Sequence, residues 1–301
     1  MKTGFKPVLW SGAAFLTLLL LAVPGLNLAA LLLMMIPYVV LYTTLSRGAF
    51  LLHLLPVWIV VGIIMPEVLL IGLFFLVPSI VMGHLYRKGA SAAKVIRTVS
   101  LVLLAQLMLE LLVFELILDL SLLNAMSDTV RSTFETMPTA TLEAAGWTTE
   151  MTETLITSII HMIPLTFILI SVTYAIFSHY VARRMVMRSG SLDVPAFMKA
   201  KDWRLPRVLV IYYLIAYVIN MFMQKGDDSF LAVALLNLVP LLGYVFAVQA
   251  IGFFFFIAHE RNWSKAVPIL IAIPVLLIPP LSLIGVLDTA FPIRKSFTKP
   301  K

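Results

Sequence analysis

Apolar residues occur along the chain in long, almost uninterrupted runs, unlike the alternating pattern of strands in a membrane barrel. A helix needs about 20 apolar residues to cross a hydrocarbon core about 30 Å thick. Helices are expected because an open sheet would leave backbone groups without hydrogen bonds in lipid. The pattern predicts nine helical segments, at 8–24, 27–45, 49–64, 67–86, 96–120, 155–180, 207–224, 229–258 and 266–287.

Basic residues are distributed unevenly between the two ends of these segments. With the N-terminus in the cytoplasm, sixteen of the twenty-two lysines and arginines fall in inner segments, and only Arg131 and Lys225 fall in outer loops. The outer loop 119–153 carries six acids against one arginine. Cytoplasmic loops of membrane proteins carry an excess of Lys and Arg. We therefore predict a cytoplasmic N-terminus. A charged start before 8–24 also fits a cleaved signal peptide, but the span that follows at once favours a first transmembrane helix.

The C-terminal tail does not fit this orientation easily. Nine crossings would place the basic tail outside, although basic residues are scarce in the outer loops elsewhere in the chain. Either the last segment is a re-entrant hairpin that turns at Pro279-Pro280, or a crossing has been miscounted elsewhere. A third alternative is that the tail does not follow the cytoplasmic excess of Lys and Arg, because earlier helices fix the orientation. We expect nine full spans, with eight as the alternative. The tail residues concerned are Arg294, Lys295, Lys299 and Lys301.

Composition agrees with a chain that lies in lipid. Hydrophobic residues make up 61% and charged residues 12% of 301 residues, whereas a soluble domain carries roughly 25% charged residues. The absence of cysteine excludes disulfides, thiolate metal sites and thiol nucleophiles. We predict an all-α, polytopic transmembrane helix bundle that occupies 1–301 as a single membrane domain.

Two loops are long enough to have structure of their own. The pattern of the outer loop 121–154 predicts short amphipathic helices that are interrupted at Met137-Pro138. Trp147 in this loop is suited to the membrane interface. We expect the loop to cap the outer face. The inner loop 181–206 is basic, with Phe197 and Trp203 between its charges.

Polar residues inside the spans are candidates for ligand binding, because ionisable groups are costly to place in a membrane. Glu115 and His161 lie at similar depth in adjacent antiparallel segments, and Gln106 shares a helix face with Glu110. One interpretation is a pocket that opens outward; the other is hydrogen bonding that holds the helices together. The candidate ligand-binding residues are Gln106, Glu110, Glu115, His161, Asn220 and Asn237.

The inner loop is a candidate for binding a partner. Basic residues with interleaved aromatics suit anionic lipid headgroups or an acidic protein, although the ordinary excess of inner positive charge also accounts for them. Nucleic acid is not expected, because the patch is short and tethered to the membrane. The candidate residues are Arg183, Arg184, Arg188, Lys199, Lys201, Trp203 and Arg204.

Motifs for catalysis are not found in the sequence. It lacks a GxxxxGK[ST] phosphate loop and a G-x-S-x-G nucleophile elbow. His259-Glu260 lacks the second histidine of a zinc-protease helix, and no histidine pair has metal-ligand spacing. We predict no enzyme, cofactor or metal. A membrane enzyme that acts on lipid-linked substrates through Glu110, Glu115 and His161 is the weaker alternative.

Two segments carry a family resemblance. VPAFMKAKDWRLPRVLVIYYL (194–214) and GVLDTAFPIRK (285–295) resemble the YybS-like family of bacterial membrane proteins. The family's Trp-Arg-Leu-Pro stretch corresponds here to 203–206. Its Gly-x-x-Asp, Phe and Arg pattern corresponds to Gly285, Asp288, Phe291 and Arg294. The similarity in helix arrangement extends over the whole length.

This family is distantly similar to the substrate-binding S components of energy-coupling-factor transporters. The resemblance implies a six-helix fold over 8–180, with additional helices at 207–287, in a multi-pass protein of the bacterial cell membrane. Such components bind a vitamin or a metal on the outer side and depend on separate ATPase and coupling subunits. The extra helices and the long acidic loop depart from that pattern, and no binding residue can be transferred.

The sequence therefore supports two functional hypotheses. The first is binding of a small solute from the outer side for import with separate energising partners. The alternative is a membrane scaffold that recruits a cytoplasmic partner or anionic lipid through 181–206.

Overall fold

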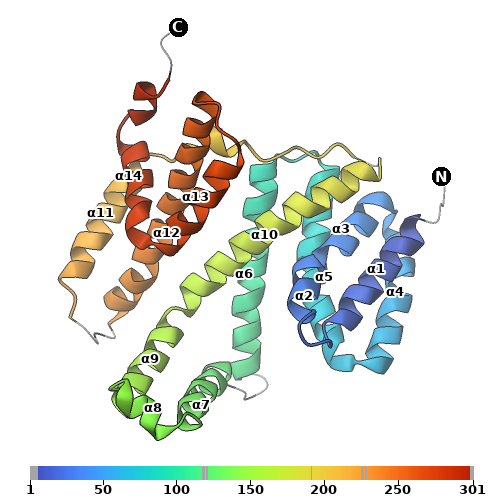
Figure 1. The fold of residues 1–301 in the computed structure, drawn as a ribbon. Coiled ribbons are helices and arrows are strands. Elements are labelled where there is room, and N and C mark those ends of the chain that lie inside the picture. The colour runs from blue at the N-terminus through green and yellow to red at the C-terminus, as the bar shows by residue number, and fades with distance from the viewer. Residues whose placement is uncertain are drawn as a thin grey trace. The chain divides into compact units, whose positions relative to one another are not determined.

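The computed structural model describes residues 6–116, 119, 121–190, 192–224, 227 and 229–298. Every regular element in these ranges is a helix (Figure 1), which confirms the predicted all-α class. Four lysines that entered the orientation argument lie outside the described residues, namely Lys2, Lys225, Lys299 and Lys301.

Six stretches in the described residues are long and apolar enough to cross a membrane. They are α2 with α3 (Asn27–Leu33 and Met35–Thr44), α4 (Arg47–Ile64), α5 (Pro66–Arg87), α6 (Ala92–Leu116), α10 (Ile163–Arg188) and α12 (Phe230–Glu260). Three shorter apolar helices are α1 (Lys6–Leu20), α11 (Val208–Met221) and α13 (Ala266–Leu277). All nine predicted segments therefore contain a helix, and the chain is a polytopic membrane helix bundle.

The chain forms two compact units. Unit 1 comprises 1–120 and 167–197, and unit 2 comprises 121–166 and 198–301. The long helix α10 begins in unit 2 and continues in unit 1.

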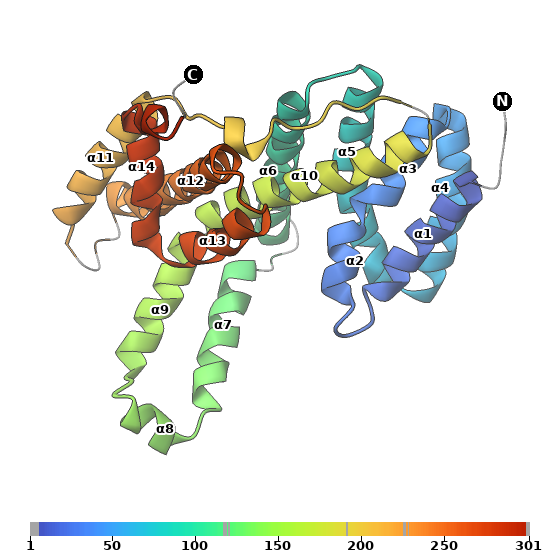
Figure 2. The ribbon, with the colours of Figure 1, turned by 45° about the horizontal axis from the view of Figure 1, so that its top comes forward.

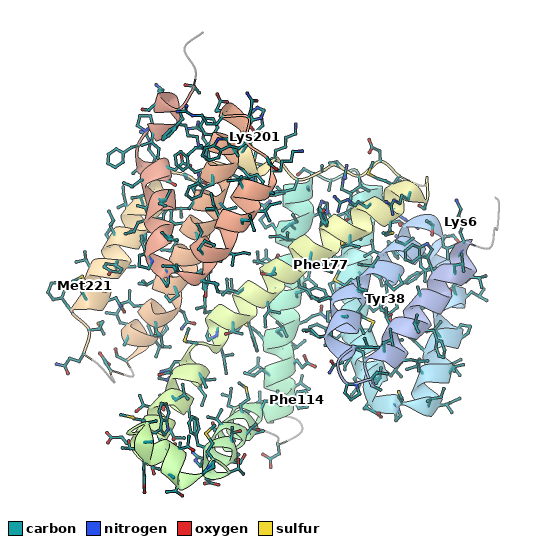
Figure 3. The ribbon with its side chains drawn as sticks, viewed as in Figure 1. Lys6, Tyr38, Phe114, Phe177, Lys201 and Met221 are labelled. Carbon is teal, nitrogen blue, oxygen red and sulfur yellow. The ribbon has the colours of Figure 1, made fainter. Side chains whose placement is uncertain are left out.

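Helix α3 forms the centre of unit 1. Its residues from Met35 to Thr43 are all buried, and Tyr38, labelled in Figure 3, has no exposed surface. Helix α5 approaches α3 closely through a glycine, because a Cβ atom at Gly83 would lie 2.7 Å from Cδ1 of Tyr42. The tightly packed core of this unit thus depends on small residues where helices meet, as is common in membranes.

An arginine caps the C-terminal end of α3. The Arg87 guanidinium donates hydrogen bonds to the carbonyl oxygens of Tyr42 and Leu45, and it lies 4.7 Å from the centre of the Tyr42 ring. The last carbonyls of a helix have no partner within the helix and carry partial negative charge. Arg87 therefore supplies both hydrogen bonds to these carbonyl oxygens and a positive charge beside them.

Unit 2 begins with a helical hairpin of α7 (Leu122–Glu135), α8 (Thr139–Ala144) and α9 (Thr149–His161). Figures 1 and 2 both show α7 and α9 side by side, joined through α8. Arg131 forms a two-pronged ion pair with Glu153, at 2.9 Å for each contact, and the rings of Phe134 and Trp147 stack at 5.0 Å. The Arg131 guanidinium holds the pKa of the Glu153 carboxyl below its usual value.

The rest of unit 2 packs around the long helix α12. Helix α14 (Ser282–Ala290) approaches it most closely at Gly285, where a Cβ atom would lie 1.9 Å from the carbonyl oxygen of Phe246. Only glycine permits two backbones to lie this close.

The last apolar segment is two helices and not one continuous helix. Helix α13 has 12 residues, about 18 Å at 1.5 Å per residue, which is less than the thickness of the hydrocarbon core. A turn of 3₁₀-helix, η2 (Pro279–Leu281), follows it and leads into α14. The prolines lack the N–H groups that a continuous helix needs.

After α14 the chain returns to the C-terminal half of α12. Arg294 lies 5.1 Å from the ring centre of Phe256, and the ring of Phe297 contacts that of Phe253 at 5.6 Å. This arrangement is compatible with the alternative of eight crossings and a re-entrant hairpin that turns at Pro279-Pro280, and the number of crossings stays a prediction.

Candidate functional site

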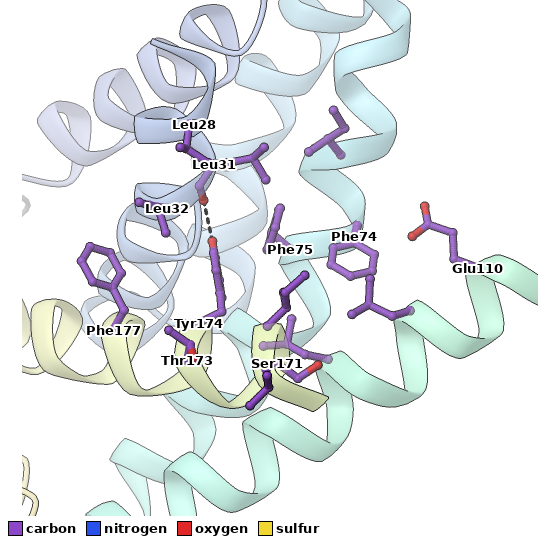
Figure 4. A pocket seen from close by; sticks show the side chains of 15 residues that line it. Leu28, Leu31, Leu32, Phe74, Phe75, Glu110, Ser171, Thr173, Tyr174 and Phe177 are labelled. Carbon is purple, nitrogen blue, oxygen red and sulfur yellow. Dashed lines mark hydrogen bonds between the residues drawn. The ribbon is translucent and has the colours of Figure 1, made fainter. Parts of the chain in front are cut away.

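A cavity of about 720 Å³ lies in unit 1, between α2, α5, α6 and α10 (Figure 4). Its walls are largely apolar, made of leucines and the rings of Phe74, Phe75 and Phe177. Sites for small molecules are typically clefts of about 300–1,000 Å³ with apolar walls and few polar groups. By size and lining, this cavity fits that description.

Four polar side chains line the cavity and have different surroundings. The Tyr174 hydroxyl donates to the carbonyl oxygen of Leu31 at 2.6 Å, and its ring stacks on Phe75 at 5.0 Å, so it is held in place. Ser171 is 1% exposed, and its buried hydroxyl has no hydrogen-bond partner among the described residues. Glu110 and Thr173, both exposed residues, complete the polar lining. Ser171 and Glu110 therefore have capacity to bind a ligand.

Gln106 supports this cavity from one turn earlier on α6. Its side-chain amide donates to the carbonyl oxygen of Phe74 at 3.0 Å, which ties α6 to α5 beside a ring that lines the cavity. Glu115 is exposed and does not contribute to this lining. Of the three predicted ligands on this helix, Glu110 lines the cavity and Gln106 positions its wall.

The other three predicted ligands belong to unit 2. The Asn237 amide accepts from the Leu165 N–H at 2.8 Å and donates to the carbonyl oxygens of His161 and Val233 at 2.8 and 2.7 Å. It thereby fastens the junction of α9 and α10 to α12. Asn220 is exposed near the end of α11. For Asn237 the structure supports the interpretation of helix-to-helix hydrogen bonding.

The basic residues predicted to bind a partner are likewise divided between the units. In unit 1, Arg183 donates to the carbonyl oxygen of Val194 at 2.6 Å, and the Arg184 guanidinium lies 3.6 Å from the ring centre of Tyr180. Arg188 is the last residue of α10. Unit 2 contains the other candidate residues, Lys199, Lys201 and Arg204 with the aromatic Trp203.

The most fully connected polar site in the described residues is a buried ion pair in unit 2. Arg294 and Asp288 have side chains 4% and 0% exposed and meet at 2.6 Å. Arg294 also donates to the carbonyl oxygens of Lys201 and Trp203, at 2.7 and 2.9 Å. The Gln249 amide donates to Asp288 at 2.6 Å. This network ties the tail and the segment before α11 to α12 and α14.

The network joins the two distant segments that carry the family resemblance. Trp203 comes from the first segment, and Gly285, Asp288 and Arg294 come from the second. Sequence reasoning did not propose Asp288 or Gln249 as site residues. An acid and an amide inside apolar segments are the signal that could have identified them, because buried polar groups require partners.

The helical structure, the apolar spans and the inner basic residues define a multi-pass protein of the bacterial membrane. The chain belongs to the family described as predicted membrane protein (DUF2232), whose family model matches residues 13–289. It is also 25% identical over 139 residues to the uncharacterized protein YybS of Bacillus subtilis (strain 168). That match covers 44% of this chain and 44% of that protein, less than half of either. No solved structure matches.

These similarities confirm the YybS-like resemblance and the membrane location. The family's description names no activity and no ligand. Similarity to the S components of energy-coupling-factor transporters stays a prediction.

Proposed function

We propose that unit 1 binds a small, largely apolar solute from the outer side of the membrane. The observation that carries this proposal is the cavity of about 720 Å³ with apolar walls and a buried serine hydroxyl without a partner.

The position of the cavity along its helices supports entry from the outer half of the bilayer. With the N-terminus inside, the outer ends are the start of α5, the end of α6 and the start of α10. Ile71, Glu110 and Leu169 line the cavity, and each lies about six residues, or roughly 9 Å, from the outer end of its helix.

The lining also indicates the chemistry of the solute. Leucine and phenylalanine side chains accept an apolar body, while Ser171 can donate to or accept from one polar group. Glu110 favours a ligand whose exposed end carries a basic or hydrogen-bond-donating group. An amphiphilic molecule with a small polar end satisfies all three features.

Import would require energy from other proteins. The sequence has no phosphate loop, so this chain would act with separate ATPase and coupling subunits, as the S components do. This part of the proposal rests on the resemblance and not on the cavity.

The proposal is tested by purifying the protein in mild detergent and identifying bound molecules by native mass spectrometry. Leu107→Trp places an indole ring in the cavity, and Leu109→Trp is the matched control because Leu109 is 60% exposed and does not line it. We expect a small molecule to accompany the wild type and Leu109→Trp but not Leu107→Trp. Ser171→Ala should weaken its binding about fivefold, the effect of one lost hydrogen bond of about 1 kcal/mol.

The same experiment can contradict the proposal. Should the wild type and Leu107→Trp carry an identical set of bulk lipids and nothing else, unit 1 would have no specific ligand. Recovery of an ATPase from native membranes only with the wild type would in addition support import.

A second candidate is recruitment of a cytoplasmic partner or anionic lipid through 181–206. It is favoured by Lys199 and Lys201, which line a cavity of their own in unit 2.

A further inference from the structure

A second cavity, of about 700 Å³, lies at the inner end of α12 in unit 2. Its polar lining is cationic and aromatic, in contrast to the apolar cavity of unit 1. The charged and polar side chains that line it are Lys199, Lys201, His259, Asn262, Trp263 and Lys265.

One wall is formed by the way in which α12 ends. Asn262 has a left-handed backbone conformation, with φ of 55°, which asparagine tolerates better than most residues. The next N–H, that of Trp263, donates back to the carbonyl oxygen of Ala258 at 2.8 Å. This helix-ending motif reverses the chain and brings Trp263 and Lys265 to the cavity.

The opposite wall is the short 3₁₀-helix η1 (Ala200–Asp202), which lies against α12. A Cβ atom at Gly252 would lie 2.9 Å from the carbonyl oxygen of Ala200, so a glycine permits this close contact. Arg294, in its buried pair with Asp288, donates to the carbonyl oxygen of Lys201. The backbone that carries Lys199 and Lys201 is therefore anchored to a buried network.

None of the three lysines of this cavity, Lys199, Lys201 and Lys265, forms an ion pair within the described residues. The acids nearest in sequence, Asp202 and Glu260, form none with them either. The carbonyl end of α12 offsets cations within its last turn only, and Lys199 and Lys201 come from a different segment.

We propose that this cavity binds a phosphate group, held by Lys199, Lys201 and Lys265, with Trp263 against the apolar part of the same ligand. Lysine ammonium groups are common ligands of phosphate, and basic pockets between membrane helices on the cytoplasmic side bind lipid headgroups. Tryptophan is enriched at the membrane interface, where such a headgroup lies. A phospholipid of the inner leaflet and a soluble phosphate compound both supply this chemistry.

This inference sharpens the second candidate function, because it names a ligand and adds two residues beyond 181–206, Trp263 and Lys265. It does not depend on the cavity of unit 1. Loss of solute binding in the Leu107→Trp variant would leave it unaffected.

The test has two arms that separate the two sources of phosphate. In the first, nanodiscs of phosphatidylcholine with and without phosphatidylglycerol are compared for lipid retained by the purified protein, measured by native mass spectrometry. In the second, detergent-solubilised protein is titrated with inorganic pyrophosphate by calorimetry. Each arm uses the wild type, a triple variant with Lys199→Gln, Lys201→Gln and Lys265→Gln, and the control Lys88→Gln from the inner end of unit 1.

We expect saturable binding in at least one arm, and a loss of about fivefold for each lysine neutralised. Lys88→Gln should keep the wild-type affinity, because Lys88 does not line the cavity. Replacing the same three lysines by arginine should retain binding, which would show that the glutamine variant lost charge and not its fold. Retention of phosphatidylglycerol alone would identify a lipid site, and binding of pyrophosphate would identify a soluble ligand.

Absence of saturable binding in both arms would overturn the proposal. An equal loss in Lys88→Gln would overturn it as well, since the lysines would then contribute only the general positive charge of the inner face.

Discussion

At the scale of single residues, the Asp288–Arg294 pair is the feature with the largest energetic consequence. Both side chains are almost fully buried, and each also hydrogen-bonds to a second element. A buried charge is tolerated only when it is paired and hydrogen-bonded, so each partner depends on the other.

We expect Asp288→Asn to destabilise the protein by about 3–5 kcal/mol, because it leaves the Arg294 charge buried without its counter-ion. Thermal unfolding in detergent, followed by intrinsic fluorescence, should show a clear fall in the midpoint. Asp202→Asn is the control, since Asp202 is exposed and forms no ion pair in the described residues. An unchanged midpoint for Asp288→Asn would contradict the assigned role of the pair.

Only some features of a candidate site residue can be predicted from the sequence, for a physical reason. The depth of a side chain along its helix can be counted, and this drew attention to Glu110, which lines the cavity of unit 1; that Glu110 binds a ligand stays a prediction. The hydrogen-bond partners of a side-chain amide cannot be predicted from its depth. Asn237 was a candidate ligand, yet its hydrogen-bonding groups are occupied by three backbone atoms.

At the scale of helices, close contact between α12 and α14 depends on Gly285. No other residue could adopt this arrangement unchanged, because its Cβ atom would overlap the backbone of Phe246 and Ala250. Since the tail and its buried ion pair follow α14, displacement of this helix would disturb both.

We therefore expect Gly285→Ala to lower the midpoint of thermal unfolding, by an amount comparable to Asp288→Asn. Gly243→Ala on α12 is the matched control. Nothing lies within 4 Å of a Cβ atom at Gly243, and alanine is favoured over glycine in a helix by about 1 kcal/mol. Gly243→Ala should thus leave the midpoint unchanged or raise it. The opposite order of the two midpoints would show that α14 does not pack as described.

Helices themselves were predictable, because an apolar run of sufficient length has few alternatives in lipid. For the last segment, 266–287, apolar length is not sufficient to predict the structure. Its length suits a crossing, but the proline pair divides it into α13 and α14, and both pack on α12. Apolar length alone cannot distinguish a crossing from a hairpin of the same composition.

At the scale of the whole molecule, a re-entrant hairpin at Pro279-Pro280 would remove the one conflict between the number of crossings and the distribution of charge. With the tail inside, its four basic residues would join the sixteen inner ones, so twenty of the twenty-two lysines and arginines would be cytoplasmic. Arg131 and Lys225 would be the two outside. Because basic residues strongly favour the cytoplasmic side, this distribution supports eight crossings independently of the packing of α14.

The native chain has no cysteine, so a single introduced cysteine reports the side of the membrane on which it lies. We expect Ser296→Cys, in the tail, to react with a membrane-impermeant maleimide only after the cells are opened. Ala140→Cys, on the exposed helix α8 of the outer hairpin, should react in intact cells and serves as the control. Labelling of Ser296→Cys in intact cells would favour nine crossings. It would also place the Asp288–Arg294 pair at the outer face, and the lysine cavity that this pair anchors could then no longer bind an inner-leaflet headgroup.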